Sequence, residues 1–207
     1  MNFYKNLYNF LIYEDKPSEY LIYLKSKGFI SYIPELQFLI GTPQDPNWHP
    51  EGDVWQHTLM VVDQANSFRT NFYYEDDFAA LMLGALCHDL GKPYTTYWEN
   101  GRWRSPKHDL VGLIPSNRLL DKIGVDVSIK EKVLSYVLEH LHTMQLYKVR
   151  DKVSKQAIIK LQQRIHIPDL VILSKADHFG RTTEDALKME APHCDWLLEK
   201  YHEYFIK

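Results

Sequence analysis

The stretch Phe78-Ala-Ala-Leu-Met-Leu-Gly-Ala-Leu-Cys-His-Asp-Leu-Gly-Lys92 organises the rest of this chain. Its first ten residues, Phe78 to Cys87, carry no charge and no strong hydrogen-bonding side chain. A helix that is apolar on every face belongs in the protein interior. His88 and Asp89 follow at its end, and burying two such polar groups without partners would be strongly unfavourable. We therefore expect this helix to carry a polar site into the core.

The way this helix ends indicates a metal site. Gly91 is expected to take the left-handed conformation that stops a helix, and Pro93 prevents the helix from resuming. The carboxyl end of a helix carries a partial negative charge, which favours a bound cation beside the His-Asp pair. The cap at the opposite end is expected at Asp76 or Asp77.

Length and composition predict a single domain over residues 1–207, with an N-terminal helical and linker part (1–50), a metal-site core (51–181) and a C-terminal helix (182–207). Hydrophobic residues make up 45% and charged residues 25% of the chain, as in ordinary globular proteins. The net charge of −3 excludes a global basic field of the kind that drives non-specific nucleic-acid binding.

Neither a membrane nor an oxidising compartment is indicated. The N-terminus lacks a basic segment followed by an apolar run, so we expect no signal peptide and no membrane span. The two cysteines, Cys87 and Cys194, do not form a disulfide framework, and a cytoplasmic location fits. The oligomeric state is left open.

Capping signals place four further polar side chains on helices. Asp53 and Gln56 form a capping box, and the helix after it turns His57 toward the core. Helices beginning at Ser105-Pro106 and at Ser128 are expected to carry His108 and His140. A helix over residues 169–178 carries Asp177, with Arg181 four residues on. The alternation around Asn100-Gly101 predicts a hairpin near residues 95–104 that pairs Trp98 with Trp103. The predicted fold is thus mostly α, a helical bundle with one small β-hairpin.

The candidate metal ligands are His57, His88, Asp89 and Asp177, which come from three helices. Imidazole and carboxylate donors suit Mn, Ni, Co, Fe or Zn, and Mg is not distinguished from them. Each residue also has an ordinary explanation. His57 alone would be a hydrogen-bonded core histidine, and Asp177 alone a solvated helix carboxylate.

The same residues carry a resemblance. His57, then His88-Asp89-Leu90-Gly91-Lys92, then Asp177 resemble the HD superfamily of metal-dependent phosphohydrolases. The run Trp48-His-Pro-Glu-Gly-Asp-Val-Trp-Gln-His-Thr-Leu-Met60 is similar to the start of the HD domain in bacterial CCA-adding enzymes (tRNA nucleotidyltransferases). The resemblance spans Pro17 to Arg181.

The resemblance implies a helical HD fold that hydrolyses phosphate esters. No counterpart of the nucleotidyltransferase head, with its Gly-Ser segment and Asp-x-Asp pair, precedes the HD part, so CCA addition is not expected. A divalent metal ion would polarise a phosphate oxygen and activate a water, with Asp89 as both a ligand and an orienter of that water. Lys92, His108 and Arg181 would contact the substrate phosphate, and His108 and His140 would donate protons or else bind a second metal.

The expected function is a phosphatase or phosphodiesterase acting on a nucleotide or an RNA terminus, such as a 2′,3′-cyclic or 2′-phosphate. The alternatives are a non-catalytic tRNA-binding or RNA-binding module, a deoxynucleotide or nucleotide phosphatase of the same fold, and an oxygenase with two irons. The hairpin is expected to be structural, although it could cover the site and stack a base. Four histidines are expected to be surface or structural residues: His49, His166, His193 and His202.

Overall fold

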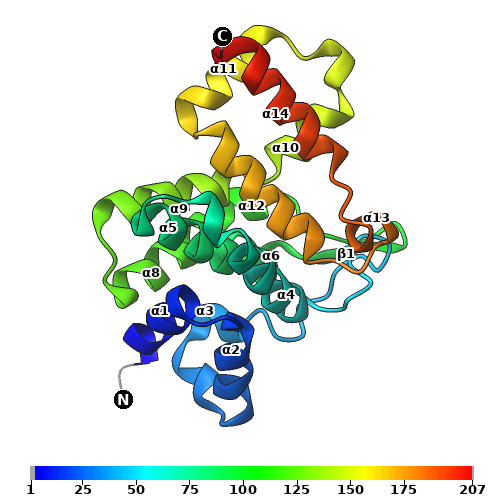
Figure 1. The fold of residues 1–207 in the computed structure, drawn as a ribbon. Helices are drawn as coiled ribbons and strands as arrows, with labels where there is room; N and C mark the ends of the chain where they lie inside the picture. The colour runs from blue at the N-terminus through cyan, green and yellow to red at the C-terminus, as the bar shows by residue number, and fades with distance from the viewer. Residues whose placement is uncertain (1–2, 207) are drawn as a thin grey trace.

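The computed structural model describes residues 3–206 as a bundle of α-helices with one two-stranded hairpin (Figure 1). This confirms the mostly helical fold. The longer helices are α1 (Phe3–Tyr13), α2 (Pro17–Ser26), α4 (Val54–Ser67), α5 (Glu75–Cys87), α8 (Leu113–Ile123), α9 (Val127–Glu139), α10 (His142–Lys148), α11 (Lys155–Arg164), α12 (Ile167–Phe179) and α14 (Pro192–Phe205). Short helical segments are η1 (Phe29–Tyr32), α3 (Pro34–Gln37), η2 (Arg69–Asn71), α6 (Lys92–Thr95), α7 (His108–Val111), η3 (Arg150–Lys152) and α13 (Glu184–Leu187). No helix among the described residues is long and apolar enough to cross a membrane.

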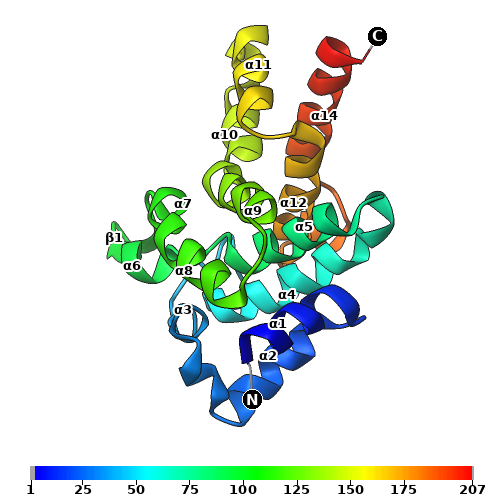
Figure 2. The same cartoon turned by 90° about the vertical axis from the view of Figure 1, so that its left-hand side faces the viewer.

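Helix α5 lies at the centre of the molecule, as its sequence predicts. It packs against α4, α9 and α12, and every residue from Phe78 to Cys87 is buried. Figures 1 and 2 show α1 and α2 below this centre, while α10, α11 and α14 form an arm that projects on the opposite side. Helix α12 runs from the arm into the centre (Figure 1). The site therefore lies where the arm meets the central helices.

Several local predictions are confirmed. Asp53 caps α4, because its side chain accepts a hydrogen bond from the backbone N–H of Gln56 at 2.8 Å. Strands β1 (Tyr97–Glu99) and β2 (Arg102–Arg104) form the antiparallel hairpin, with Trp98 opposite Trp103. The two indole rings meet edge to face, with 5.2 Å between their centroids.

Three predicted helix starts are wrong. Helix α5 begins at Glu75 after Tyr74, so its three acidic residues occupy the first turn, where the helix dipole favours them, and none of them is the N-cap. Helix α9 begins after Asp126 and not at Ser128, without a side-chain capping bond. The segment after the hairpin becomes helical only at His108, because Lys107 takes a left-handed conformation at φ 58°.

The expected role of Gly91 is also wrong, and the structure gives a different reason for a glycine there. Gly91 has a right-handed helical conformation at φ −81°. A Cβ atom at this position would lie 2.0 Å from the carbonyl oxygen of His108 and 2.7 Å from the backbone nitrogen of Gly112. The chain after α5 thus touches the backbone of α7, which brings Asp89 and His108 together.

The close backbone contact predicts an unusually costly substitution. Gly91→Ala should lower the free energy of unfolding by about 3 kcal/mol or more, because the methyl group meets backbone that cannot rotate away. Gly84→Ala is the matched control, since Gly84 is also buried and helical but faces the side chain of Tyr136. The higher helix propensity of alanine, about 1 kcal/mol, partly offsets that contact. Urea unfolding of both variants measures the difference, and equal losses would contradict this explanation.

Candidate metal centre

Four histidines converge on one polar centre beneath the arm, and each is held through its Nδ1 atom. The Nδ1 atoms of His88, His108 and His140 lie 2.9, 2.6 and 2.7 Å from backbone carbonyl oxygens of Ala85, Ser105 and Val137. A carbonyl oxygen accepts a hydrogen bond, so each of these nitrogens carries the proton. Each Nε2 of a neutral ring is then a lone pair available to a cation.

The fourth histidine, His57, is oriented by a carboxylate instead. Its Nδ1 lies 2.9 Å from Oε1 of Glu51, and its Nε2 lies 3.0 Å from Oδ1 of Asp177. Gly180 makes this approach possible, because a Cβ atom there would lie 2.5 Å from the side chain of Val61 on α4. The end of α12 therefore packs directly on α4, and Asp177 reaches His57.

Asp89 lies between the four imidazoles. Its Oδ2 is 3.2 Å from Nε2 of His88 and 3.9 Å from Nε2 of His57, whereas its Oδ1 is 3.3 Å from Nε2 of His108. Neither carboxylate oxygen forms a hydrogen bond with the described residues, and Nε2 of His88 is also without one. The ammonium group of Lys92 compensates part of this negative charge, and a metal cation would pair with the lone pairs that remain.

The donor atoms fall into three groups whose ligand atoms lie within 4.8 Å of one another. Two of them surround Asp89: His57, His88 and Asp177 on one side, and Asp89, His108 and His140 on the other. The third, His49, Glu51 and His57, shares His57 with the first. Nε2 of His108 is only 3.1 Å from Nε2 of His140, a contact that requires a proton or a cation because both Nδ1 atoms already donate. The set of imidazole and carboxylate donors fits a divalent transition metal. Asp89, with one oxygen toward each of the first two groups, lies beside both.

Two cations flank the carboxylates. Nζ of Lys92 lies 2.6 Å from Oδ2 of Asp89 and donates to Oε1 of Gln44 at 2.7 Å. Arg181 donates through Nη2 to both oxygens of Asp177, at 2.9 and 3.0 Å. The predicted i, i+4 pairing of these two residues is present even though α12 ends before Gly180.

Charges around the site shift the pKa values of its buried groups. Burial raises the pKa of Asp89, but His88 and Lys92 outweigh this effect and hold that pKa well below its usual range. Burial likewise raises the pKa of Asp177, and Arg181 and His57 outweigh it. Burial lowers the pKa of His140 to about 3, reinforced by His108. The carboxylates are therefore ionised and His140 is neutral at pH 7.

A pocket of about 290 Å³ opens onto this centre. Its residues come from the loop before α4, the hairpin, α7, α10, α12 and the start of α14. They include Asp89, Lys92, His108, His140, Asp177 and Arg181, so six predicted site residues share one cavity. His57 and His88 lie behind the pocket as fully buried side chains.

Four residues at the site are not among the predicted site residues: Glu51, His49, His178 and His193. His49 and His193 were expected to be surface or structural residues, yet both line the pocket, and His193 is only 4% exposed. His178 lines the pocket as well, and neither of its ring nitrogens has a hydrogen-bond partner among residues 3–206. Glu51 lies in the run Trp48–Met60 that resembles the start of an HD domain. Helical periodicity could not assign it to the site, because it lies in a loop.

The comparisons with known proteins agree with this geometry. The family model described as HD domain matches residues 54–182. The Multifunctional CCA protein of Vibrio parahaemolyticus is 31% identical over 175 residues, which cover 80% of this chain and 40% of the relative. That of Pseudoalteromonas atlantica is 30% identical over 195 residues, 91% of this chain and 45% of the relative. The chain thus spans less than half the length of these curated relatives.

The donor set predicts how metal affinity responds to substitution. Asp89→Ala should abolish tight binding of Mn²⁺ or Ni²⁺, because it removes the carboxylate beside both groups. Glu51→Gln should weaken binding by about 10- to 100-fold, since Glu51 orients His57 but is not one of the four proposed ligands. Isothermal titration of metal into protein stripped with a chelator measures both effects. Asp151→Ala, which removes an exposed carboxylate on η3, is the control. Unchanged affinity in Asp89→Ala would contradict the assignment.

The buried histidines predict a loss of stability in mild acid for the metal-free protein. The folded-state pKa of His140 is about 3 and that of His193 about 4, both lowered by burial first, against 6.5 for a free imidazole. Between pH 6.5 and about 4 the unfolded chain therefore binds more protons. The free energy of unfolding then decreases as the pH is lowered, by at most about 1.4 kcal/mol per pH unit for each histidine. Urea unfolding at pH 7, 6 and 5 measures the slope, which should be shallower in His193→Gln. An identical slope would contradict the prediction.

Proposed function

Because the chain belongs to the HD-domain family, we propose that it is a metal-dependent phosphohydrolase acting on a nucleotide or on the nucleotide end of an RNA. One observation carries the proposal. Four imidazoles anchored through Nδ1 point their Nε2 atoms at two ionised carboxylates beside an open pocket. Lys92 and Arg181 pair with these carboxylates, whereas the imidazole lone pairs remain for a metal cation, which would lie next to a substrate in the pocket.

His57, His88, Asp89 and Asp177 are proposed to hold a divalent metal ion. When bound, the ion supplies Lewis acidity toward a phosphate oxygen and lowers the pKa of a water molecule. Asp89 contributes a second function, because its Oδ1 faces the pocket side of the centre near His108 and can orient a water there. Three groups are proposed to contact the substrate phosphate: Lys92, His108 and Arg181.

The proton chemistry is assigned to His108 and His140. Their Nε2 atoms are 3.1 Å apart, and burial lowers the pKa of both rings, so a proton that enters between them is held weakly. This pair can donate that proton to the leaving oxygen of the phosphate ester. The alternative, in which both histidines and Asp89 hold a second metal, makes the bound stoichiometry two ions instead of one, and the titration above distinguishes them.

A nucleotide is supported by the outer part of the pocket. Trp48 and Trp103 line it together with Gln44 and Asp45, and Trp48 is 55% exposed. Exposed indole rings stack on nucleobases, which contributes about 1–3 kcal/mol for each base. The volume of about 290 Å³ is at the lower end for ligand pockets, so it suits one nucleotide better than a longer segment. Similarity to the Multifunctional CCA proteins also supports a nucleotide or RNA end.

The second candidate is a non-catalytic RNA-binding module. Such a module would need the pocket and the tryptophans, but its function would not require imidazole and carboxylate atoms that converge as metal ligands. The intact donor set favours the enzyme.

The test is hydrolysis of 2′,3′-cyclic AMP and of adenosine 2′- and 3′-monophosphate, with Mn²⁺, Ni²⁺ or Co²⁺ added. Wild type is expected to release product with at least one of these metals, and Asp89→Ala should lose about 100-fold or more in kcat/KM. Asp151→Ala is again the control, and chelation should abolish activity in every variant. Metal binding without turnover of any nucleotide would overturn the proposed reaction, and absence of both would favour the binding module.

A further inference from the structure

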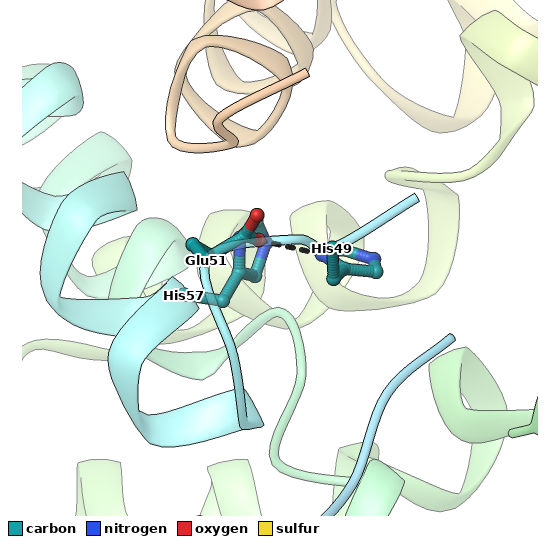
Figure 3. A group of neighbouring side chains, drawn as sticks. All are labelled: His49, Glu51 and His57. Carbon is teal, nitrogen blue, oxygen red and sulfur yellow. Dashed lines mark hydrogen bonds and ion pairs between the residues drawn. The ribbon is translucent and has the colours of Figure 1, made fainter. Parts of the chain in front are cut away.

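Figure 3 shows the cluster His49, Glu51 and His57, with Glu51 and His49 on the loop before α4 and His57 on that helix. The proposed chemistry uses only His57 of these three residues. Oε1 of Glu51 accepts a hydrogen bond from Nδ1 of His49 at 2.8 Å and lies 2.9 Å from Nδ1 of His57. Its Oε2 accepts a hydrogen bond from the backbone N–H of Thr182 at 3.3 Å. One carboxylate thus holds two imidazoles and joins the loop to the segment after α12.

The contact with Glu51 fixes the tautomer of His49. Oε1 of Glu51 lies 2.8 Å from Nδ1 of His49, and the Glu51 side chain is only 1% exposed. A carboxylate oxygen accepts hydrogen bonds, so Nδ1 of His49 carries the proton. Nε2 of the neutral ring is consequently an acceptor.

Nε2 of His49 has no partner among residues 3–206, and it is available to a ligand. Figure 3 shows this nitrogen on the side of the ring that faces away from Glu51. His49 lines the pocket together with Lys92 and Arg181, and its ring centroid is 4.6 Å from that of His57. Asp89 and Asp177 of the metal centre line the same pocket, so a substrate phosphate bound at the centre would share this cavity with His49.

An acceptor in this position is unsuited to the phosphate itself. Phosphate oxygens are acceptors too, so they are bound by Lys92 and Arg181 and not by the lone pair of His49. What His49 can bind is a hydroxyl group adjacent to the phosphate.

We propose that His49, oriented by Glu51, recognises the substrate by accepting a hydrogen bond from the ribose hydroxyl next to the phosphate. This inference rests on the proposed function and gives its substrate class: ribose 2′- or 3′-phosphates with a free neighbouring hydroxyl, in preference to deoxyribose phosphates. In these compounds the hydroxyl and the phosphate are on adjacent carbons, so both would lie in the pocket that His49 shares with Lys92 and Arg181.

The test compares adenosine 3′-monophosphate with its 2′-deoxy counterpart in wild type and two variants. His49→Asn keeps an amide near the position of Nδ1, so it can still donate to Glu51, but it removes the acceptor in the pocket. His49→Gln places an amide oxygen near the position of Nε2. His202→Asn, an exposed histidine on α14, is the control.

Wild type should favour the ribonucleotide by about tenfold in kcat/KM, the value of one hydrogen bond, and mainly through KM. His49→Asn should reduce this preference to about one without changing KM for the deoxynucleotide, and His49→Gln should retain part of it. Metal affinity should stay within about threefold of wild type in both variants, which separates recognition from damage to the centre.

Two results would overturn the proposal: an unchanged sugar preference in His49→Asn, or a fall in kcat that is equal for both sugars, which would assign His49 to the attacking water. If wild type hydrolyses neither compound, the proposed function fails, and binding then decides the role of His49. Quenching of tryptophan fluorescence by the two nucleotides reports binding, because Trp48 and Trp103 line the same pocket. Tighter binding of the ribonucleotide that is lost in His49→Asn supports the proposal, and equal binding in wild type overturns it.

Discussion

The site depends on the hydrogen bonds that fix the Nδ1 atoms of its histidines. His88 and His140 are the C-cap residues of α5 and α9, and each donates to the carbonyl three residues earlier. The last carbonyl groups of a helix have no intrahelical partner, so a histidine at this position satisfies one of them and has its own ring fixed in return. The same bond makes Nδ1 the protonated nitrogen and turns the lone pair of Nε2 inward. The same hydrogen bond thus caps the end of the helix and orients the histidine as a metal ligand.

The second requirement is that separate helices approach closely enough for these lone pairs to meet. Gly91 allows backbone contact with α7, and Gly180 allows the end of α12 to contact α4. In both places a single methyl group would occupy space already filled by neighbouring atoms, and each contact brings a carboxylate to a histidine from another helix. Packing at the two glycines therefore sets the geometry of the polar centre. Burial in that packed interior makes it unfavourable to leave the ligand atoms unpaired, which favours binding of a metal cation.

These two requirements explain what the sequence could and could not predict. The uncharged run before His88 predicted a buried helix ending in a polar pair, because burial follows from composition. The inward direction of His57 and His140 followed from helical periodicity. Glu51, His49 and His193 were missed because they lie in a loop or at a helix start, where side-chain direction depends on contacts between distant segments. Gly91 was assigned a turn conformation because the sequence does not show that the backbone of His108 lies against it.

Glu51 connects the two functions that the site is proposed to perform. Its carboxylate contacts His57, which is proposed to hold the metal, and His49, which is proposed to contact the substrate hydroxyl. Both imidazoles are directed by the same oxygen atom, so a movement of this carboxylate displaces the two rings together. The other oxygen is bound to the backbone of Thr182, just beyond Arg181, which restrains that movement. Metal coordination and recognition of the sugar would then share one restrained group, and the distance between metal and hydroxyl would be set by the protein and not by the substrate.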